Sequence, residues 1–312
     1  MLRLTFLGTA SSRPTVSRNV PALALKREGR RFLLDCGEGT QRQMMRYGVG
    51  FSVGDILITH LHSDHYLGLA GLLRTMSLQG REEPLRIWAP RGAGGALRTL
   101  RDLGGARLAF EAPVRELRAG EAIEGDGYRL EAFATDHTLA SLGYALLEDP
   151  RPGRFDVGAA RALGVPEGPL FGRLHGGESV ELEDGRRVDP TDLIGPPRPG
   201  RKLVYTGDTR PSPRTVEIAG GADLLVHEAT FSAEEARRAR ETGHSTAGGA
   251  ARIAAEAGVK RLVLTHISAR YSERPTRLLE EARAIFPRTE LARDGWSVEV
   301  LFDDADSGGA TP

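Results

Sequence analysis

The sequence has little cysteine, few aromatic residues and no excess of charge of either sign. Its one cysteine, Cys36, excludes an intramolecular disulfide and a metal site built from several thiolates, and it suits a reducing compartment. Basic and acidic residues both number 42, so net charge does not indicate a nucleic-acid binder and any polyanion site must be local. No run approaches the roughly 18 apolar residues of a membrane-spanning helix, and the start lacks the pattern of a signal peptide. We therefore expect a cytoplasmic protein without membrane contact.

What the sequence does contain is a series of short apolar runs, each followed by a polar loop. These runs are RFLLDCGEG, DILITHLHSDH, YRLEAFATDH, KLVYTGDT, DLLVHEAT and RLVLTHIS. Their length and their content of Ile, Leu and Val are typical of buried strands. Helical patterns follow at 66–78 and, behind a possible cap at Ser245, at 246–257. This alternation predicts a layered α/β fold in which polar residues converge at the strand ends.

One stretch, 149–199, differs from this pattern. It carries clustered proline and glycine, a short helical piece at 157–163, and the hairpin-like run SVELEDGRRVD with an Asp-Gly turn. We interpret it as an insertion, bounded at 150–198, in a single catalytic domain that spans 1–312.

Four potential metal ligands lie within six residues, directly after the apolar run that ends at Ile58. They are His60, His62, Asp64 and His65. Imidazole and carboxylate are the ligands that zinc accepts when thiolate is not offered. A purely structural role would have to explain why three of the 8 histidines cluster here. The motif therefore predicts a zinc site.

Three further polar residues follow other predicted strands. Taken singly, each would be a residue with its hydrogen bonds made within the protein or a residue at the surface. Together they complete a site for two ions, which needs six or seven ligands. We assign His60, His62 and His137 to one ion, Asp64, His65 and His266 to the other, and Asp208 as the bridge.

The motif THLHSDH with the later histidines and aspartate resembles the metallo-β-lactamase superfamily. Further motifs between 7 and 271 resemble the ribonuclease Z family of tRNA 3′-end endonucleases: FLGTASSRP, SRN, LLDCGEGTQRQ, GPLFG, LEDGR, GDTR, HEATF, GHST and THISARY. The resemblance implies an αββα four-layer sandwich, two zinc ions and a homodimer. It also implies cleavage of precursor tRNA after the discriminator base, which leaves a 3′-hydroxyl, and a short form with one catalytic domain. The insertion would be the family's protruding arm, which grips tRNA.

Three acidic or imidazole groups are candidates for the chemistry beside the ions. Water shared by two cations would attack phosphorus, with Asp64 counted among both ligands and catalytic groups. His244 is a suitable proton donor for the leaving 3′-oxygen if a carboxylate holds it, and Glu228 is the candidate for that carboxylate, a pairing that the resemblance also implies. Taken alone, Glu228 would be a surface acid and His244 a loop histidine. We expect Asp35 to orient a histidine of the metal site, or else to stabilise the turn in which it lies.

Substrate contacts are predicted at three places. Ser245 and Thr246 could bind phosphate through backbone N–H groups, or merely cap a helix. The resemblance implies a PxxxRN loop that helps to recognise the mature CCA end, here with Arg18 and Asn19, although Val16 and Ser17 are neutral where relatives often have another basic residue. In the arm it implies a glycine-proline motif, Gly168 and Pro169. The outer arm carries four arginines against two acids: Arg151, Arg154, Arg161 and Arg173 against Asp156 and Glu167.

Other functions remain open at this point. The metal motif alone would also serve a small-molecule phosphodiesterase or sulfatase, against which the arm argues. A thiolesterase or lactamase is less well supported, because no substrate loop of theirs is present. An RNA-binding module on a degenerate hydrolase scaffold would lack ligands, whereas all seven are here.

Overall fold

The computed structural model of the chain describes residues 1–105 and 107–303. Contacts along the chain divide it into two compact units. The first contains Met1–Leu147 and the described chain from Arg201 onward, and the second is Glu148–Gly200.

The first unit contains two sheets of seven strands each. The strand order of the first sheet is β16 (Ser297–Glu299), β1 (Leu2–Gly8), β2 (Ala22–Arg27), β3 (Arg30–Leu34), β4 (Asp55–Leu57), β5 (Arg86–Pro90) and β6 (Val114–Leu117). Strands β3 to β6 are parallel and the others antiparallel. The order of the second is β15 (Thr289–Leu291), β14 (Leu262–Thr265), β13 (Leu224–Glu228), β12 (Lys202–Tyr205), β9 (Leu142–Glu148), β8 (Tyr128–Ala134) and β7 (Ala122–Gly125). Here β12 to β15 are parallel.

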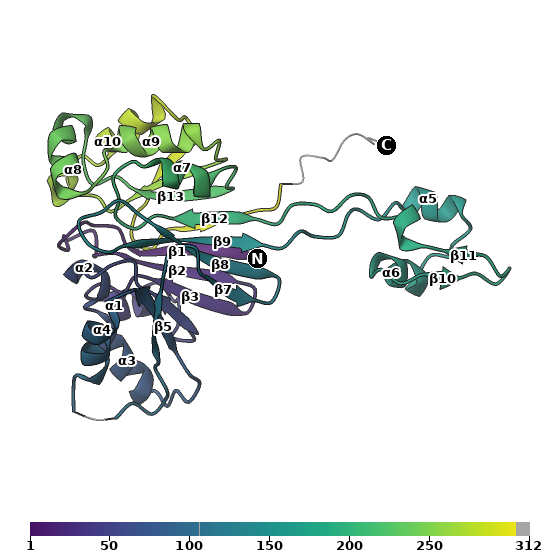
Figure 1. Cartoon of the computed structure of the whole chain (residues 1–312), viewed down its shortest axis with the longest axis horizontal. Coiled ribbons are helices and arrows are strands. Elements are labelled where there is room, and N and C mark those ends of the chain that lie inside the picture. Colours follow the sequence, from purple (N-terminus) through teal and green to yellow (C-terminus); the bar gives the residue numbers. More distant parts are fainter. Residues whose placement is uncertain (106, 304–312) are drawn as a thin grey trace. The chain divides into compact units, whose positions relative to one another are not determined.

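Helices lie on the outer side of each sheet (Figure 1). On the first sheet they are α1 (Thr40–Arg46), α2 (Ser63–Tyr66), α3 (Leu69–Leu78) and α4 (Gly94–Asp102). On the second they are α7 (Pro213–Ala219), η2 (Ala233–Glu235), α8 (Ala236–Thr242), α9 (Ala247–Glu256), η3 (Ala269–Tyr271) and α10 (Thr276–Arg283). In the described part of the chain, every helix is too short or too polar to cross a membrane.

Three apolar cores hold these four layers together. The central core lies between the sheets, and residues such as Phe6 from β1 and Tyr144 from β9 are almost fully buried there. A second core packs α1, α3 and α4 against the first sheet, and a third packs α7, α9 and α10 against the second. Strands that are buried on both faces explain the continuous apolar runs in the sequence. The expected αββα four-layer sandwich is confirmed.

Two helix boundaries differ from those predicted. The helix expected at 66–78 begins at Leu69 as α3, and the separate short helix α2 precedes it at Ser63–Tyr66. The predicted cap of α9, Ser245, donates its hydroxyl instead to the Thr209 carbonyl at 2.7 Å. Thr246 caps the helix, because its Oγ1 accepts the Gly249 N–H at 3.0 Å.

The second unit has its own small fold. It contains α5 (Val157–Ala162), α6 (Pro169–His175), β10 (Val180–Glu181), β11 (Arg187–Val188) and η1 (Pro190–Asp192). Strands β10 and β11 pair as the hairpin that the Asp-Gly turn predicted. A separate apolar core includes Ala160, Leu174 and Val188. Backbone hydrogen bonds in both directions join Arg151 to Arg198, so the two ends of the segment lie side by side.

Candidate functional site

The predicted metal ligands all follow the ends of strands in the first unit. His60 and His62 come after β4, and Asp64 and His65 lie in α2, which begins at the next residue. The other three follow β8, β12 and β14: His137, Asp208 and His266. His266 takes a left-handed φ of 58°, which is uncommon for a residue with a side chain. Such a conformation costs free energy and persists where the surrounding structure demands it.

The first ligand group gathers around one carboxylate oxygen of Asp208. His60 Nε2 lies 3.6 Å and His137 Nε2 4.0 Å from Asp208 Oδ2. His62 Nδ1 lies 3.0 Å from the Nε2 atoms of both His60 and His137. These four residues point one ligand atom each into a common space.

The second group shares Asp208. His65 Nε2 lies 3.6 Å from Asp64 Oδ2, and His266 Nε2 lies 3.5 Å from the same oxygen. Asp208 Oδ2 is 3.4 Å from His65 Nε2, and its Oδ1 is 3.3 Å from His266 Nε2. Asp208 therefore lies between both groups, in the position predicted for a bridging ligand.

The spacing of these atoms fits metal ions. Two donors bound about 2.0–2.1 Å from one tetrahedral zinc ion lie about 3.3 Å from each other. His65 Nε2, His266 Nε2 and Asp208 Oδ1 are buried atoms that form no hydrogen bond within the described chain. Leaving three buried polar atoms unsatisfied is costly, and bound cations would satisfy all of them.

Hydrogen bonds fix the orientation of three of the ligand rings. His65 Nδ1 bonds to Asp35 Oδ2 at 2.8 Å, His137 Nδ1 to the Gly243 carbonyl at 2.7 Å and His266 Nδ1 to Thr230 Oγ1 at 2.8 Å. Each bond leaves Nε2 free to bind metal, as is usual for histidine ligands.

Asp35 occupies the position predicted for a residue that supports the ligands. Its buried carboxylate accepts hydrogen bonds from His65, from the Thr59 backbone and hydroxyl, and from the Tyr205 hydroxyl at 2.8 Å. Sequence reasoning missed Tyr205, because it lies 170 residues away in the chain.

Electrostatics favour cations at both positions. Burial and the neighbouring His65 lower the pKa of His60 well below its usual value, so the ring is neutral, as a ligand must be. Burial also lowers the pKa of His65, but Asp208, Asp35 and Asp64 outweigh it and raise that pKa well above the usual value. A position that attracts a proton so strongly will also attract a metal ion.

Glu228 and His244 form a hydrogen-bonded pair beside the candidate metal ligands, as predicted. His244 Nδ1 donates to Glu228 Oε1 at 2.8 Å. Burial lowers the pKa of His244, but the Glu228 carboxylate outweighs it and raises the pKa to about 9. Thr230 donates its hydroxyl to Glu228 Oε2 at 2.7 Å and so links this pair to His266. Thr230 was not among the predicted site residues, although it lies in the HEATF motif.

The predicted substrate contacts mostly serve the protein's own structure. Arg18 is buried, and its guanidinium donates to Thr9 Oγ1 at 2.6 Å and to the Ala292 carbonyl at 2.7 Å. Asn19 donates its side-chain amide to the Glu38 carbonyl at 2.8 Å. The hydroxyls of Ser245 and Thr246 are both engaged at the start of α9. Gly168 and Pro169 form the N-cap and first residue of α6 in the second unit.

A hollow of about 400 Å³ lies against His244, and sequence reasoning did not find it. Arg13, Phe231, Arg238 and Arg270 line it together with His244. All of these residues except Arg238 lie in motifs that carried the resemblance, but their convergence depends on the fold. Arginines beside an aromatic ring are suited to bind a nucleotide.

A four-layer sandwich with a histidine and aspartate centre at its strand ends defines a metal-dependent hydrolase of the metallo-β-lactamase superfamily. Two protein-family models match parts of the chain. The family model of the anti-Pycsar protein Apyc1 matches residues 2–151, and that of the β-lactamase superfamily domain matches residues 182–267. The chain is 57% identical over 305 residues to ribonuclease Z of Gemmatimonas aurantiaca, covering 97% of each, and 54% identical over 311 residues to that of Haloferax volcanii, covering 99% and 98%. It therefore belongs to the ribonuclease Z family, endonucleases that hydrolyse phosphodiesters.

Solved structures agree with this assignment. The short form of human tRNase Z has a TM-score of 0.69 and 28% identity, with 96% of this chain and 100% of that chain covered. Unliganded yeast PDE1 has a TM-score of 0.64 at 13% identity, with 95% and 98% covered, which shows the common fold alone.

Proposed function

We propose that this chain removes the 3′ trailer from precursor tRNA with two zinc ions and leaves a 3′-hydroxyl on the tRNA. One observation carries the proposal. A complete ligand set lies beside the Glu228–His244 pair in a chain that matches ribonuclease Z relatives over its full length.

In this proposal the ligands hold two ions as assigned from the sequence. His60, His62 and His137 hold one, Asp64, His65 and His266 hold the other, and Asp208 joins them. When bound, the pair of cations supplies a hydroxide nucleophile near neutral pH and neutralises charge on the phosphoryl group. The backbone N–H of Ser12 donates to Asp64 Oδ2 at 2.7 Å and so holds that carboxylate in place.

His244 is the proposed proton donor. The bond from its Nδ1 to the Glu228 carboxylate holds the ring and favours its protonated form, which leaves Nε2 to protonate the leaving 3′-oxygen. The nucleotide that carries this oxygen is the discriminator nucleotide, the last one of the tRNA product. It therefore lies on the His244 side of the scissile bond, beside the arginine-lined hollow.

The second unit is the proposed tRNA-binding arm, with Gly168 and Pro169 shaping the start of α6. Two of its arginines are engaged in exposed ion pairs, Arg161 with Glu167 at 2.6 Å and Arg173 with Glu178 at 3.0 Å. Exposed pairs of this kind contribute only about 0–1 kcal/mol, so phosphates can replace the acidic partners at little cost.

We also propose a homodimer that acts in the cytoplasm. Large apolar side chains on the outer helices of the first sheet are exposed, Met45 by 65% and Leu78 by 88%. A second copy of the chain would cover such residues. The buried, unpaired Cys36 suits a reducing compartment. Light scattering coupled to gel filtration would give the mass of a dimer, and Leu78→Glu would reduce it.

Substrate preference tests the proposed function against a small-molecule phosphodiesterase. Zinc-loaded protein is incubated with a precursor tRNA, with an unstructured RNA of equal length and with a cyclic nucleotide. We expect kcat/KM for the precursor to exceed the other two by roughly 100-fold or more, since remote contacts orient only the folded tRNA. Preference for the cyclic nucleotide would favour the alternative.

A further inference from the structure

Three basic residues form one row across neighbouring strands of the first sheet. The register pairs Arg3 of β1 with Lys26 of β2, and Lys26 with Arg31 of β3. Residues directly opposite each other lie on the same face of a sheet. The neighbours Leu25 and Phe32 belong to the core between the sheets, so the row points to the other face, on the side of α1.

The three cations of this row have no ion-pair partner within the described chain. Like charges directly opposite each other in a sheet are destabilising. Within the described chain, none of the three side chains forms an ion pair or a hydrogen bond, whereas the nearby Arg86 is paired with the buried Asp55 at 2.7 Å. The acid in the row itself, Glu299 of β16 opposite Arg3, makes no ion pair with it.

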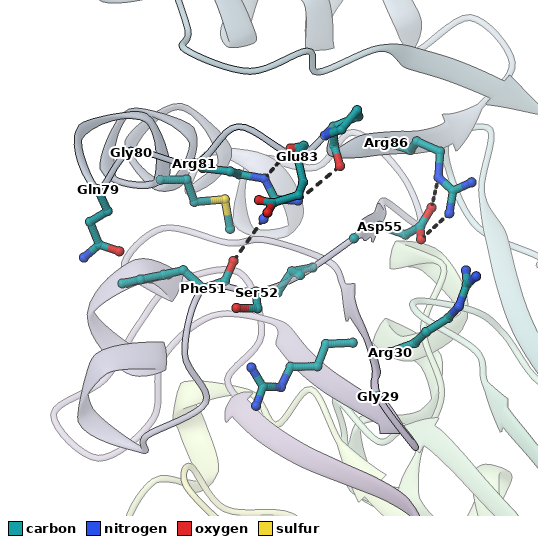
Figure 2. Close-up of a pocket in the computed structure, with 15 residues that line it drawn as sticks. Gly29, Arg30, Phe51, Ser52, Asp55, Gln79, Gly80, Arg81, Glu83 and Arg86 are labelled. Atoms are coloured by element: carbon teal, nitrogen blue, oxygen red, sulfur yellow. Dashed lines mark hydrogen bonds and ion pairs between the residues drawn. The ribbon is translucent and has the colours of Figure 1, made fainter.

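Two hollows flank the row and meet at Arg31. The smaller, of about 250 Å³, is lined by Arg3, Lys26, Arg31 and Tyr47 among others. The larger, of about 830 Å³, lies on the other side of Arg31 and is shown in Figure 2.

In the larger hollow the arginines fall into two kinds. The Arg81 guanidinium donates to the carbonyls of Phe51, Glu83 and Pro84, and Arg86 binds Asp55, so both serve the fold. Figure 2 shows no bond to Arg30, which is exposed at the start of β3. The uncommitted cations of this hollow are therefore Arg31, which belongs to the row, and Arg30, its neighbour in the chain.

We propose that this basic row, Arg3, Lys26 and Arg31 with Arg30, binds the phosphates of the single-stranded trailer beyond the scissile bond. Strands lie about 4.8 Å apart, so the three aligned cations extend over about 10 Å, a length suited to a nucleic-acid backbone and not to one small anion. Tyr47 and Phe51 add aromatic surface in the two hollows, on which bases can stack.

The polarity of cleavage explains why the trailer goes there. The inference rests on the proposed function, in which His244 marks the tRNA side of the bond. His244 belongs to the half of the unit built on the second sheet, so the trailer leaves toward the first sheet. Arg31 is the second residue of β3 and Asp35 follows its last residue, about 13 Å away along the strand direction, so a few nucleotides can reach the row.

Trailer length provides the test. We compare holoenzyme with Lys26→Gln/Arg31→Gln on precursors that have trailers of 2 and 20 nucleotides. The control is Arg214→Gln/Arg252→Gln, which removes two exposed charges from α7 and α9. We expect KM for the long trailer to rise about 10-fold in the row variant only, with kcat unchanged and the short trailer unaffected. Equal KM for both lengths in every variant would overturn the proposal.

Binding of a free 20-nucleotide trailer RNA to the zinc-loaded protein, followed by fluorescence anisotropy, separates this proposal from the proposed function. Each phosphate contact with a single strand contributes about 0.7 to the slope of log affinity against log salt, so the row variant should lose about 1.4. The expected loss of slope concerns binding of the free trailer RNA alone, so it can be measured even if precursor tRNA is not cleaved. An unchanged slope, or equal competition by inorganic polyphosphate at matched phosphate concentration, would contradict a site for RNA.

Discussion

The bond between Glu228 and His244 sets the charge of the proposed proton donor. In zinc-free protein we expect the pKa of His244 to be about 9, and Glu228→Gln to lower it, because burial alone disfavours the imidazolium. NMR titration of the ring protons measures this directly. The matched control is Glu241→Gln, an exposed acid on α8.

The raised pKa of His244 also makes the stability of the zinc-free protein depend on pH. Because the folded-state pKa is raised above the unfolded value of about 6.5, the stabilisation is complete below about pH 6.5 and is lost as pH rises through about 9. Stability curves of zinc-free protein should show this loss in the wild type and a smaller one in Glu228→Gln. Identical curves would mean that Glu228 does not hold the charge of His244.

Asp208 lies between the two candidate ligand groups and is the proposed bridge. Asp208→Ala should lower zinc content below two ions per chain and reduce activity roughly 100-fold or more, since even indirect partners of a metal site contribute 10–100-fold. Elemental analysis and kinetics measure the two effects. Asp136→Ala, next to a ligand but paired with Arg210 at 2.9 Å, should keep both ions. Normal turnover of Asp208→Ala with two ions bound would refute the bridge.

Among single residues, the sequence predicted the candidate ligands that stand in a short motif or directly after a strand. The four ligands after β4 stand in one motif, and strand ends indicated the other three. The bonds from Tyr205 to Asp35 and between Thr230 and His266 could not be predicted, because the fold brings these distant residues together. Arg18 shows the opposite case, where a residue in a recognisable motif turns inward to bind Thr9.

Thr246, the N-cap of α9, has two candidate roles, which are capping the helix and binding phosphate. Thr246→Ala should lower the free energy of unfolding by about 0.5–2 kcal/mol through loss of the bond to Gly249, while KM for precursor tRNA stays within about twofold. Urea unfolding and kinetics measure the two quantities. Thr99→Ala on the exposed face of α4 should change stability by less than about 0.5 kcal/mol. A large rise in KM with stability intact would show phosphate binding instead.

Among the elements, strands were more predictable than helix ends. Strands buried on both faces appear as apolar runs, whereas no break in the apolar pattern of 66–78 indicated that the helix would begin only at Leu69. The pairing of β1 with β16 joins residues almost the whole chain apart, and no local pattern could indicate it.

At the scale of the molecule, the second unit can be removed without touching a ligand. Arg151 and Arg198 are bonded to each other, so a short Gly-Ser turn can replace 152–197. We expect two zinc ions and unchanged hydrolysis of a nitrophenyl phosphodiester, but roughly 100-fold lower kcat/KM for precursor tRNA, mainly through KM. Circular dichroism and metal analysis establish that the variant is folded and loaded. Unchanged tRNA cleavage would mean that this unit is not the tRNA-binding arm.

The position and chemistry of the cut test the central claim most directly. A precursor tRNA labelled at both ends is incubated with zinc-loaded protein, with Asp208→Ala as the inactive control, and the products are mapped to the nucleotide. The account predicts one cut immediately after the discriminator base, with a 3′-hydroxyl on the tRNA and a 5′-phosphate on the trailer, because the nucleophile is water and His244 protonates the 3′-oxygen. Scattered cuts, or a cyclic phosphate on the tRNA, would contradict it.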